Sequence, residues 1–181
     1  MRRISVVGSS GSGKTTMARE LSRLLGVPFA EIDALNWGPN WTEATPEDLR
    51  KKVEEVIAGD AWVIDGNYHN RIGTMVWDRA DTVVWLNPPK RKVMWRSFTR
   101  TVRRASSGEE LWNGNRETWD NLKFWRGEES ILVWAWTAYP RRQKYYEAAM
   151  ADPQWAEMVF YRLRTNRDVK RFLRSVKNSA G

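Results

Sequence analysis

The chain carries near its start the run Gly8-Ser9-Ser10-Gly11-Ser12-Gly13-Lys14-Thr15, which matches the pattern G-x-x-x-x-G-K-T. A β-branched run, Ile4 to Val7, precedes it, and apolar residues at helical spacing follow it from Met17 to Leu25. Strand, glycine-rich turn and helix form the setting in which such a run points backbone N–H groups at phosphate oxygens. The run therefore predicts a phosphate-binding loop.

The residue types in this run specify the ligand further. A helix N-terminus adds about half a positive charge beside the phosphates. We expect Lys14 to reach the β- and γ-phosphates of a nucleoside triphosphate and the Thr15 hydroxyl to bind Mg²⁺. The residues expected to hold ATP here are Gly8, Ser9, Gly11, Ser12, Gly13, Lys14, Thr15 and Thr16.

Strand and helix patterns alternate along the rest of the chain. Further strands are expected at 27–33, 61–65, 82–86 and 158–163. Helices are expected at 46–58, 89–105, 129–151 (with an interruption at Pro140) and 167–176. This alternation predicts an α/β fold with a parallel sheet between two helical layers, within one domain of 181 residues.

Two aspartates close predicted strands, Asp33 after residues 27–32 and Asp65 after Trp62-Val63-Ile64. Ligands of parallel sheets bind beyond the carboxyl ends of the strands, where the phosphate loop also lies. We expect Asp65 to bind Mg²⁺ or its water shell, and Asp33 to orient or deprotonate an acceptor hydroxyl. Two carboxylates and a phosphate loop at one edge predict phosphoryl transfer.

The predicted helix at 89–105 has an apolar face and a basic face. Met94, Phe98 and Val102 are expected to face inward, opposite Lys92, Arg96, Arg100 and Arg103. Arg100, Arg103 and Arg104 lead into a glycine-containing segment that could fold over the phosphates, with Arg116 or Arg126 adding charge. The candidate catalytic residues are Lys14, Asp33, Asp65, Arg100 and Arg104.

Composition limits the classes of function. The chain has no cysteine, which excludes disulfides and thiolate metal sites. No apolar run approaches the roughly 20 residues of a membrane span, and a strand begins almost at the N-terminus, so we expect a cytoplasmic protein. The net charge of +8 suits nucleic acid, but it also suits an enzyme with phosphorylated substrates. The pattern leaves the oligomeric state open.

Taken together these motifs resemble the nucleoside-monophosphate-kinase superfamily of small P-loop kinases, which includes adenylate and shikimate kinases. More narrowly, the chain resembles the adenylate-kinase-related group called topology modulation proteins. That narrower resemblance rests on residues 32–41 (IDALNWGPNW), 62–68 (WVIDGNY), 80–86 (ADTVVWL) and 162–167 (RLRTNR).

The resemblance implies the P-loop NTPase fold, with a five-stranded parallel sheet in the order 2-3-1-4-5 and a helical lid. It places an acceptor-binding region at about 34–60 and the lid at about 104–128, and it puts Arg164 to Arg167 near the adenine. Adenylate kinases follow the third-strand Asp-Gly with Phe-Pro-Arg. This chain has Asn67, Tyr68 and His69 there, and Arg71 is the nearest substitute for that arginine.

Three functions remain open on this reading. The leading hypothesis is an ATP- and Mg²⁺-dependent kinase acting on a small-molecule acceptor, either a nucleotide or another hydroxylated metabolite. The second is a kinase for the 5′-hydroxyl of a nucleic acid, suggested by the basic charge. The third is a nucleotide-binding sensor without turnover. Two carboxylates placed for chemistry favour the first hypothesis over the third.

Overall fold

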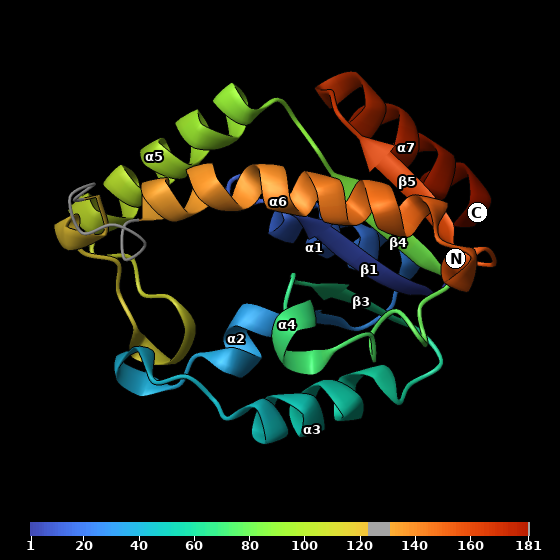
Figure 1. Cartoon of the computed structure of the whole chain (residues 1–181), viewed down its shortest axis with the longest axis horizontal. Coiled ribbons are helices and arrows are strands. Elements are labelled where there is room, and N and C mark those ends of the chain that lie inside the picture. Colours follow the sequence, from blue (N-terminus) through green and yellow to red (C-terminus); the bar gives the residue numbers. More distant parts are fainter. Residues whose placement is uncertain (123–130, 181) are drawn as a thin grey trace.

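Five parallel strands form a sheet in the order β2-β3-β1-β4-β5 (Figure 1). This computed structural model describes residues 1–122 and 131–180, without the side chains of 121, 122, 131–135 and 180. The strands are β1 (Arg3–Gly8), β2 (Phe29–Glu31), β3 (Trp62–Asp65), β4 (Thr82–Leu86) and β5 (Val159–Leu163). All four strand pairs are parallel, so the predicted sheet and its strand order are confirmed.

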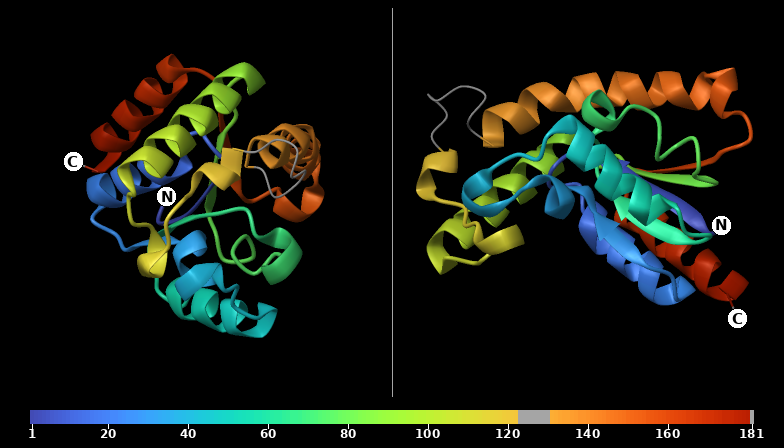
Figure 2. Two further views of the ribbon diagram at one scale, coloured as in Figure 1. Left: turned by 90° about the vertical axis from the view of Figure 1, so that its left-hand side faces the viewer. Right: turned by 90° about the horizontal axis from the view of Figure 1, so that it is seen from below.

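Helices cover both faces of the sheet, as Figure 2 shows. The longer helices are α1 (Lys14–Leu25), α3 (Pro46–Ile57), α5 (Lys90–Ser107), α6 (Ile131–Ala151) and α7 (Asn166–Ala180). The short ones are α2 (Ile32–Asn36), α4 (His69–Ile72) and the 3₁₀ turns η1 (Pro39–Trp41), η2 (Trp112–Gly114), η3 (Trp119–Leu122) and η5 (Pro153–Trp155).

Two apolar cores separate these layers. On one face Ile4 and Val6 of β1 belong to the core that includes α1 and α7. On the other face Val7 belongs to the core that includes α3, α4 and α6. The alternation along β1 follows from the two-residue period of a strand. Because both faces are covered, the central strands β1, β3 and β4 are buried along nearly their whole length, and the carboxyl ends of the strands are left to form a site.

The structure corrects the predicted face of α5. Phe98 is 40% exposed, whereas Val93, Ser97 and Thr101 are buried. The small Ser97 lets α5 approach the phosphate loop closely: its Oγ donates to Ser10 O at 3.1 Å. Hydrophobic periodicity therefore indicated the wrong face, because this helix packs on a polar loop instead of an apolar layer.

Two other predicted elements differ from the structure. The predicted strand 27–33 is shorter, since β2 ends at Glu31 and Asp33 lies in α2. The turn into α2 places Ile32 against Gly66, where a Cβ would lie 2.8 Å from the Ile32 Cβ. The helix α6 continues through Pro140 without the predicted interruption. Pro140 is exposed, so water can satisfy the carbonyl that its missing N–H leaves free.

The segment after α5 departs from regular structure, as expected, and its described part contains η2 and η3. Arg126 and the rest of 123–128 lie outside the described residues. None of the helices that the structure describes combines the length and the apolar character needed to cross a membrane.

Candidate active site

The phosphate loop joins β1 to α1 and depends on its glycines. Gly8, Gly11 and Gly13 have φ angles of 146°, 79° and 100°, a region that favours glycine. Gly11 also lies against α5, where an added Cβ would be 2.7 Å from Val93 O. The glycine spacing thus meets two needs, the curl of the loop and its contact with α5.

Lys14 opens α1 and folds back over this loop, donating from Nζ to Ser9 O at 3.4 Å. Ser9 and Ser12 are buried, and Ser12 N donates to Ser9 O at 3.0 Å. Thr16, by contrast, is exposed on α1. The loop therefore offers a lysine ammonium and backbone N–H groups in the arrangement expected for phosphate.

Thr15 and Asp65 meet beside the loop. The Thr15 hydroxyl donates to Asp65 Oδ2 at 2.5 Å and approaches Glu31 Oε1 at 3.3 Å. Burial raises the pKa of Asp65 to about 6, although the charge of Lys14 opposes that rise. The other carboxylate oxygen, Oδ1, is buried and makes no hydrogen bond in the described part of the chain.

These two residues fit a magnesium ion. A hydroxyl and a carboxylate are hard oxygen ligands, and the buried Asp65 Oδ1 offers an acceptor for the ion's water shell. Among the described residues no cluster of three His, Asp or Glu side chains could hold a metal without other ligands. Phosphate oxygens and water would have to complete such a site, which is the usual arrangement for Mg²⁺.

Asp33 lies in α2 and faces the same cleft. The Tyr68 hydroxyl donates to Asp33 Oδ1 at 2.6 Å. Burial and the nearby Asp33 charge raise the pKa of Tyr68, so the phenol stays protonated and keeps donating. This bond fixes the orientation of the Asp33 carboxylate, which suits a group that must align an acceptor hydroxyl.

The arginines of α5 divide into two groups. Arg100 donates from Nη2 to Ser10 Oγ at 2.9 Å, and Arg104 donates to Glu117 Oε1 at 2.9 Å; both line the cleft. Arg103 instead pairs with Glu109 on the outside, where its side chain is 69% exposed. The structure thus brings Arg100 and Arg104, but not Arg103, to the predicted site.

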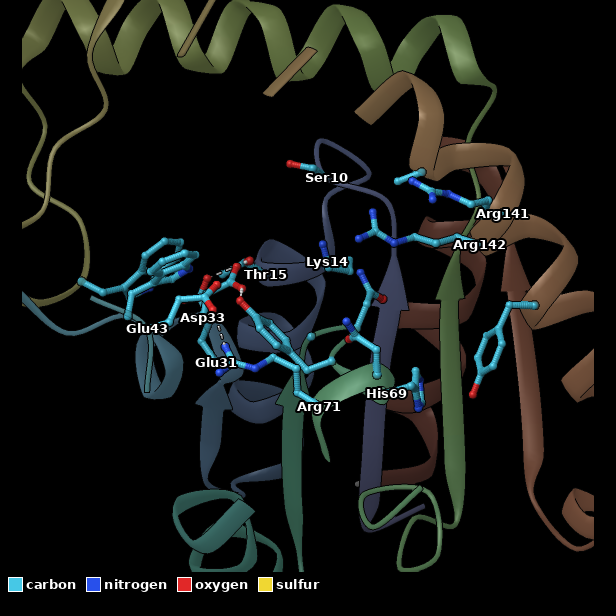
Figure 3. Close-up of a pocket in the computed structure, with 18 of the residues that line it drawn as sticks. Ser10, Lys14, Thr15, Glu31, Asp33, Glu43, His69, Arg71, Arg141 and Arg142 are labelled. Carbon is cyan, nitrogen blue, oxygen red and sulfur yellow. Dashed lines mark hydrogen bonds and ion pairs between the residues drawn. The ribbon is translucent and has the colours of Figure 1, made fainter. Parts of the chain in front are cut away.

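A cleft of about 1340 Å³ follows the carboxyl edge of the sheet, beside the phosphate loop (Figure 3). Its lining includes the expected Lys14, Thr15, Asp33, Arg100 and Arg104. It also includes residues that the sequence analysis did not name as catalytic or binding residues, namely Glu31, Trp41, Glu43, Asn67, Tyr68, His69, Trp112, Glu117, Arg141, Arg142, Tyr145 and Tyr146; of these, Trp41 and Glu43 fall in the expected acceptor-binding region and Trp112 and Glu117 in the expected lid. The large volume leaves room for an acceptor beside a triphosphate.

Two unpredicted arginines enter this cleft from α6. Figure 3 shows Arg142 directed toward Lys14, with Arg141 beside it. Burial lowers the pKa of Arg142, although guanidinium remains charged in proteins. The signal in the sequence was the adjacent pair Arg141-Arg142 one helical turn before Tyr145-Tyr146, whose importance depended on where α6 packs.

Arg71, the expected substitute for a substrate-binding arginine, has protein partners. Its Nη1 donates to Asn36 Oδ1 at 2.5 Å and to Glu43 Oε2 at 3.1 Å, and its Nη2 donates to the Ala44 carbonyl. These contacts hold the segment after α2 against α4. Arg71 therefore has a structural role here, although it also borders the cleft.

Arg164 and Arg167 lie apart from this cleft. Arg164 is exposed in the turn between β5 and α7, and Arg167 is exposed in the first turn of α7. Both lie near the start of α5, where Lys92 Nζ donates to Asn166 Oδ1 at 2.9 Å. Arg167 borders a smaller hollow of about 320 Å³ together with Arg171 and Arg174. Contact between Arg164 or Arg167 and adenine stays a prediction.

Comparison with known sequences agrees with the position of the phosphate loop. The model of the AAA family (ATPase family associated with various cellular activities) matches residues 4–64, which run from β1 through β3. Shikimate kinase 2 of Sodalis glossinidius (strain morsitans) is 35% identical over 57 residues, or 32% of this chain. The match covers 28% of that relative's length, so it compares only part of the two proteins.

Comparison with solved structures extends over the whole chain. Shikimate kinase from Bacteroides thetaiotaomicron superposes with a TM-score of 0.55 at 15% identity, covering 98% of this chain and 97% of that one. Shikimate kinase from Acinetobacter baumannii, solved in complex with shikimate, gives 0.56 at 18% identity, covering 97% and 90%. At these identities the likeness concerns the fold. With its strand order and phosphate loop, the chain has the P-loop NTPase fold in the form found in small kinases.

Proposed function

We propose that the chain is a phosphotransferase that moves the γ-phosphoryl group of Mg-ATP to a hydroxyl of a small acceptor. The observation that carries the proposal is the meeting of the phosphate loop, Asp33 and the α5 arginines in one cleft, with Asp65 buried directly behind Thr15. Phosphoryl transfer needs few covalent steps from the protein, but it needs charge neutralisation and an aligned nucleophile. Each of these needs has a candidate residue in the cleft.

The residues divide the work as follows. Lys14 and the loop N–H groups bind the phosphates. Thr15 and Asp65 would hold Mg²⁺, which would supply positive charge to offset that of the phosphates. Asp33, held by Tyr68, aligns the acceptor hydroxyl and takes its proton as the new O–P bond forms and the bond to the leaving ADP breaks. Arg100 and Arg104 stabilise charge on the group in transit.

We propose a nucleotide or another hydroxylated metabolite as the acceptor. The solved kinases of similar fold include one in complex with shikimate, and this supports a small hydroxylated acceptor over a nucleic acid. The exposed hollow beside Arg167, Arg171 and Arg174 is where a nucleic-acid alternative would place its anion. We place the enzyme in the cytoplasm, where ATP and such acceptors occur.

The test is ADP release from Mg-ATP with nucleoside monophosphates, nucleosides, small hydroxylated acids and 5′-hydroxyl oligonucleotides as acceptors. One class of small molecule is expected to stimulate release, and Lys14→Ala is expected to lower that rate by about 100-fold or more. Lys177→Ala, which removes an exposed lysine at the end of α7, is the matched control. ATP binding without stimulated release would contradict the proposal and favour a sensor.

A further inference from the structure

Two loops of similar shape border the cleft on the side of Asp33. Residues 37–43 are closed by an antiparallel bridge between Trp37 and Glu43, and residues 110–117 by one between Glu110 and Arg116. Each loop has a 3₁₀ turn at its tip, η1 or η2, and each carries an asparagine in the left-handed region. Figure 1 shows the second loop descending from α5 to meet the first.

Asn115 makes two of the hydrogen bonds that join these loops, and Asn113 Nδ2 makes another by donating to Trp37 O. The Oδ1 of Asn115 accepts from Trp41 N at 2.7 Å, and its Nδ2 donates to Gly38 O at 2.8 Å and to Trp112 O at 2.9 Å. The residue is 4% exposed, so these bonds replace water at a buried amide. Nearby, the Trp41 indole N–H donates to Arg116 O at 3.3 Å.

The contact assembles an aromatic wall from two distant segments. Trp37 and Trp41 lie edge to face with ring centroids 5.5 Å apart, and Trp41 and Trp112 do so at 6.4 Å. All three rings line the cleft, which also contains Asp33. Such pairs prefer edge-to-face geometry, so a shift of either loop would break the wall.

We propose that Asn115 is a positioning residue that determines acceptor specificity by docking loop 110–117 on loop 37–43. The inference rests on the proposed kinase function, because the wall contains the acceptor only if Asp33 aligns it. The bonds across the two loops are polar, so water can replace them when the loops part. Asn115 is the buried side chain among the cross-loop bonds, so its loss displaces the aromatic wall. A displaced wall weakens acceptor binding and leaves the phosphate loop intact.

The test compares Asn115→Asp and Asn115→Ala with Asn178→Ala, an exposed asparagine on α7. Asn115→Asp keeps the acceptor for Trp41 N but replaces the donor to two carbonyl oxygens by a negative charge. Both Asn115 variants are expected to raise KM for the stimulating acceptor about ten-fold or more, with KM for ATP within about two-fold. Hydrogen exchange at the Trp41 amide should speed up, while the amides of β1 and β3 keep their protection and report an intact fold.

The outcomes separate the two proposals. If no acceptor stimulates ADP release by the wild type, both the proposed kinase function and this inference are wrong. If an acceptor stimulates the wild type but its KM is the same in both Asn115 variants, only this inference is wrong. An equal rise of KM for ATP and acceptor would also overturn it, since that result indicates general loosening of the cleft.

Discussion

Asn67 ties the phosphate loop to two other parts of the fold, and its removal gives a sharp test of the structure. Gly8 N donates to Asn67 Oδ1 at 3.0 Å, and Asn67 Nδ2 donates to Gly8 O at 2.6 Å. The Tyr146 hydroxyl of α6 donates to the same Oδ1 at 2.6 Å. One side chain after β3 thus holds the end of β1 and the middle of α6.

Asn67→Ala removes all three bonds and leaves polar groups of Gly8 and Tyr146, both buried residues, without these hydrogen-bond partners. A hydrogen bond contributes about 0.5–1.5 kcal/mol to stability, and a buried polar group left without a hydrogen bond costs about 1–3 kcal/mol. We therefore expect the free energy of unfolding to fall by about 3 kcal/mol. Tyr146→Phe removes a single bond and should cost about 1 kcal/mol.

Urea unfolding of the wild type, both single variants and the double variant measures these values. Because the two side chains share a bond, the double variant should lose about 1 kcal/mol less than the sum of the singles. Asn70→Ala, at an exposed neighbouring asparagine, is the control and should change stability by less than about 0.5 kcal/mol. A loss below about 1 kcal/mol for Asn67→Ala, or strict additivity, would refute the described network.

Two further predictions concern the same edge of the sheet. Burial raises the pKa of Asp65 from 3.8 to about 6, so folding disfavours the charged carboxylate. The contribution of Asp65 to the free energy of unfolding is therefore fully present below pH 3.8 and is lost as the pH rises to about 6. As the pH rises through that range, the free energy of unfolding of metal-free Asp65→Asn should therefore increase by about 2–3 kcal/mol relative to that of the wild type, measured by urea unfolding in EDTA. A difference between variant and wild type that is the same at all pH values would contradict this prediction. Gly11→Ala should cost about 2–4 kcal/mol, because φ is 79° and the new Cβ would meet Ser97 Oγ at 2.6 Å. Gly26→Ala, at φ 65° with open space, should cost only about 1 kcal/mol in the same urea unfolding assay, and equal losses for the two variants would show that contact with α5 is unimportant.

The parts of the site that were predictable depend on short stretches of sequence. The phosphate loop and Thr15 follow from a strand, a turn and a helix whose order alone sets the geometry, and Asp65 follows from its place at the carboxyl end of an apolar strand. The sheet order followed from the family resemblance, and the structure confirms it. These features can be predicted without knowing which elements pack against one another.

The rest depends on contacts between distant residues. Asn115 bonds to Gly38, 77 positions away, and Tyr146 to Asn67, 79 positions away. The arginine pair of α6 belongs to the cleft because that helix packs across the sheet edge, where Tyr146 bonds to Asn67 and Tyr139 to Pro88 O. Periodicity also failed for α5, since it assumes that a helix buries its most apolar face.

The way α6 is held has a mechanical consequence. Two tyrosines hold it: the Tyr146 hydroxyl donates to Asn67 Oδ1, and the Tyr139 hydroxyl donates to Pro88 O at 2.9 Å. They lie seven residues apart, or about 10 Å at the helical rise of about 1.5 Å per residue, and Arg142 lies between them. A helix segment supported on both sides moves less than an overhanging end, so a displacement of the part before Tyr139 moves Arg142 little. The two supports therefore keep Arg142 within the small tolerance that alignment of reacting groups requires.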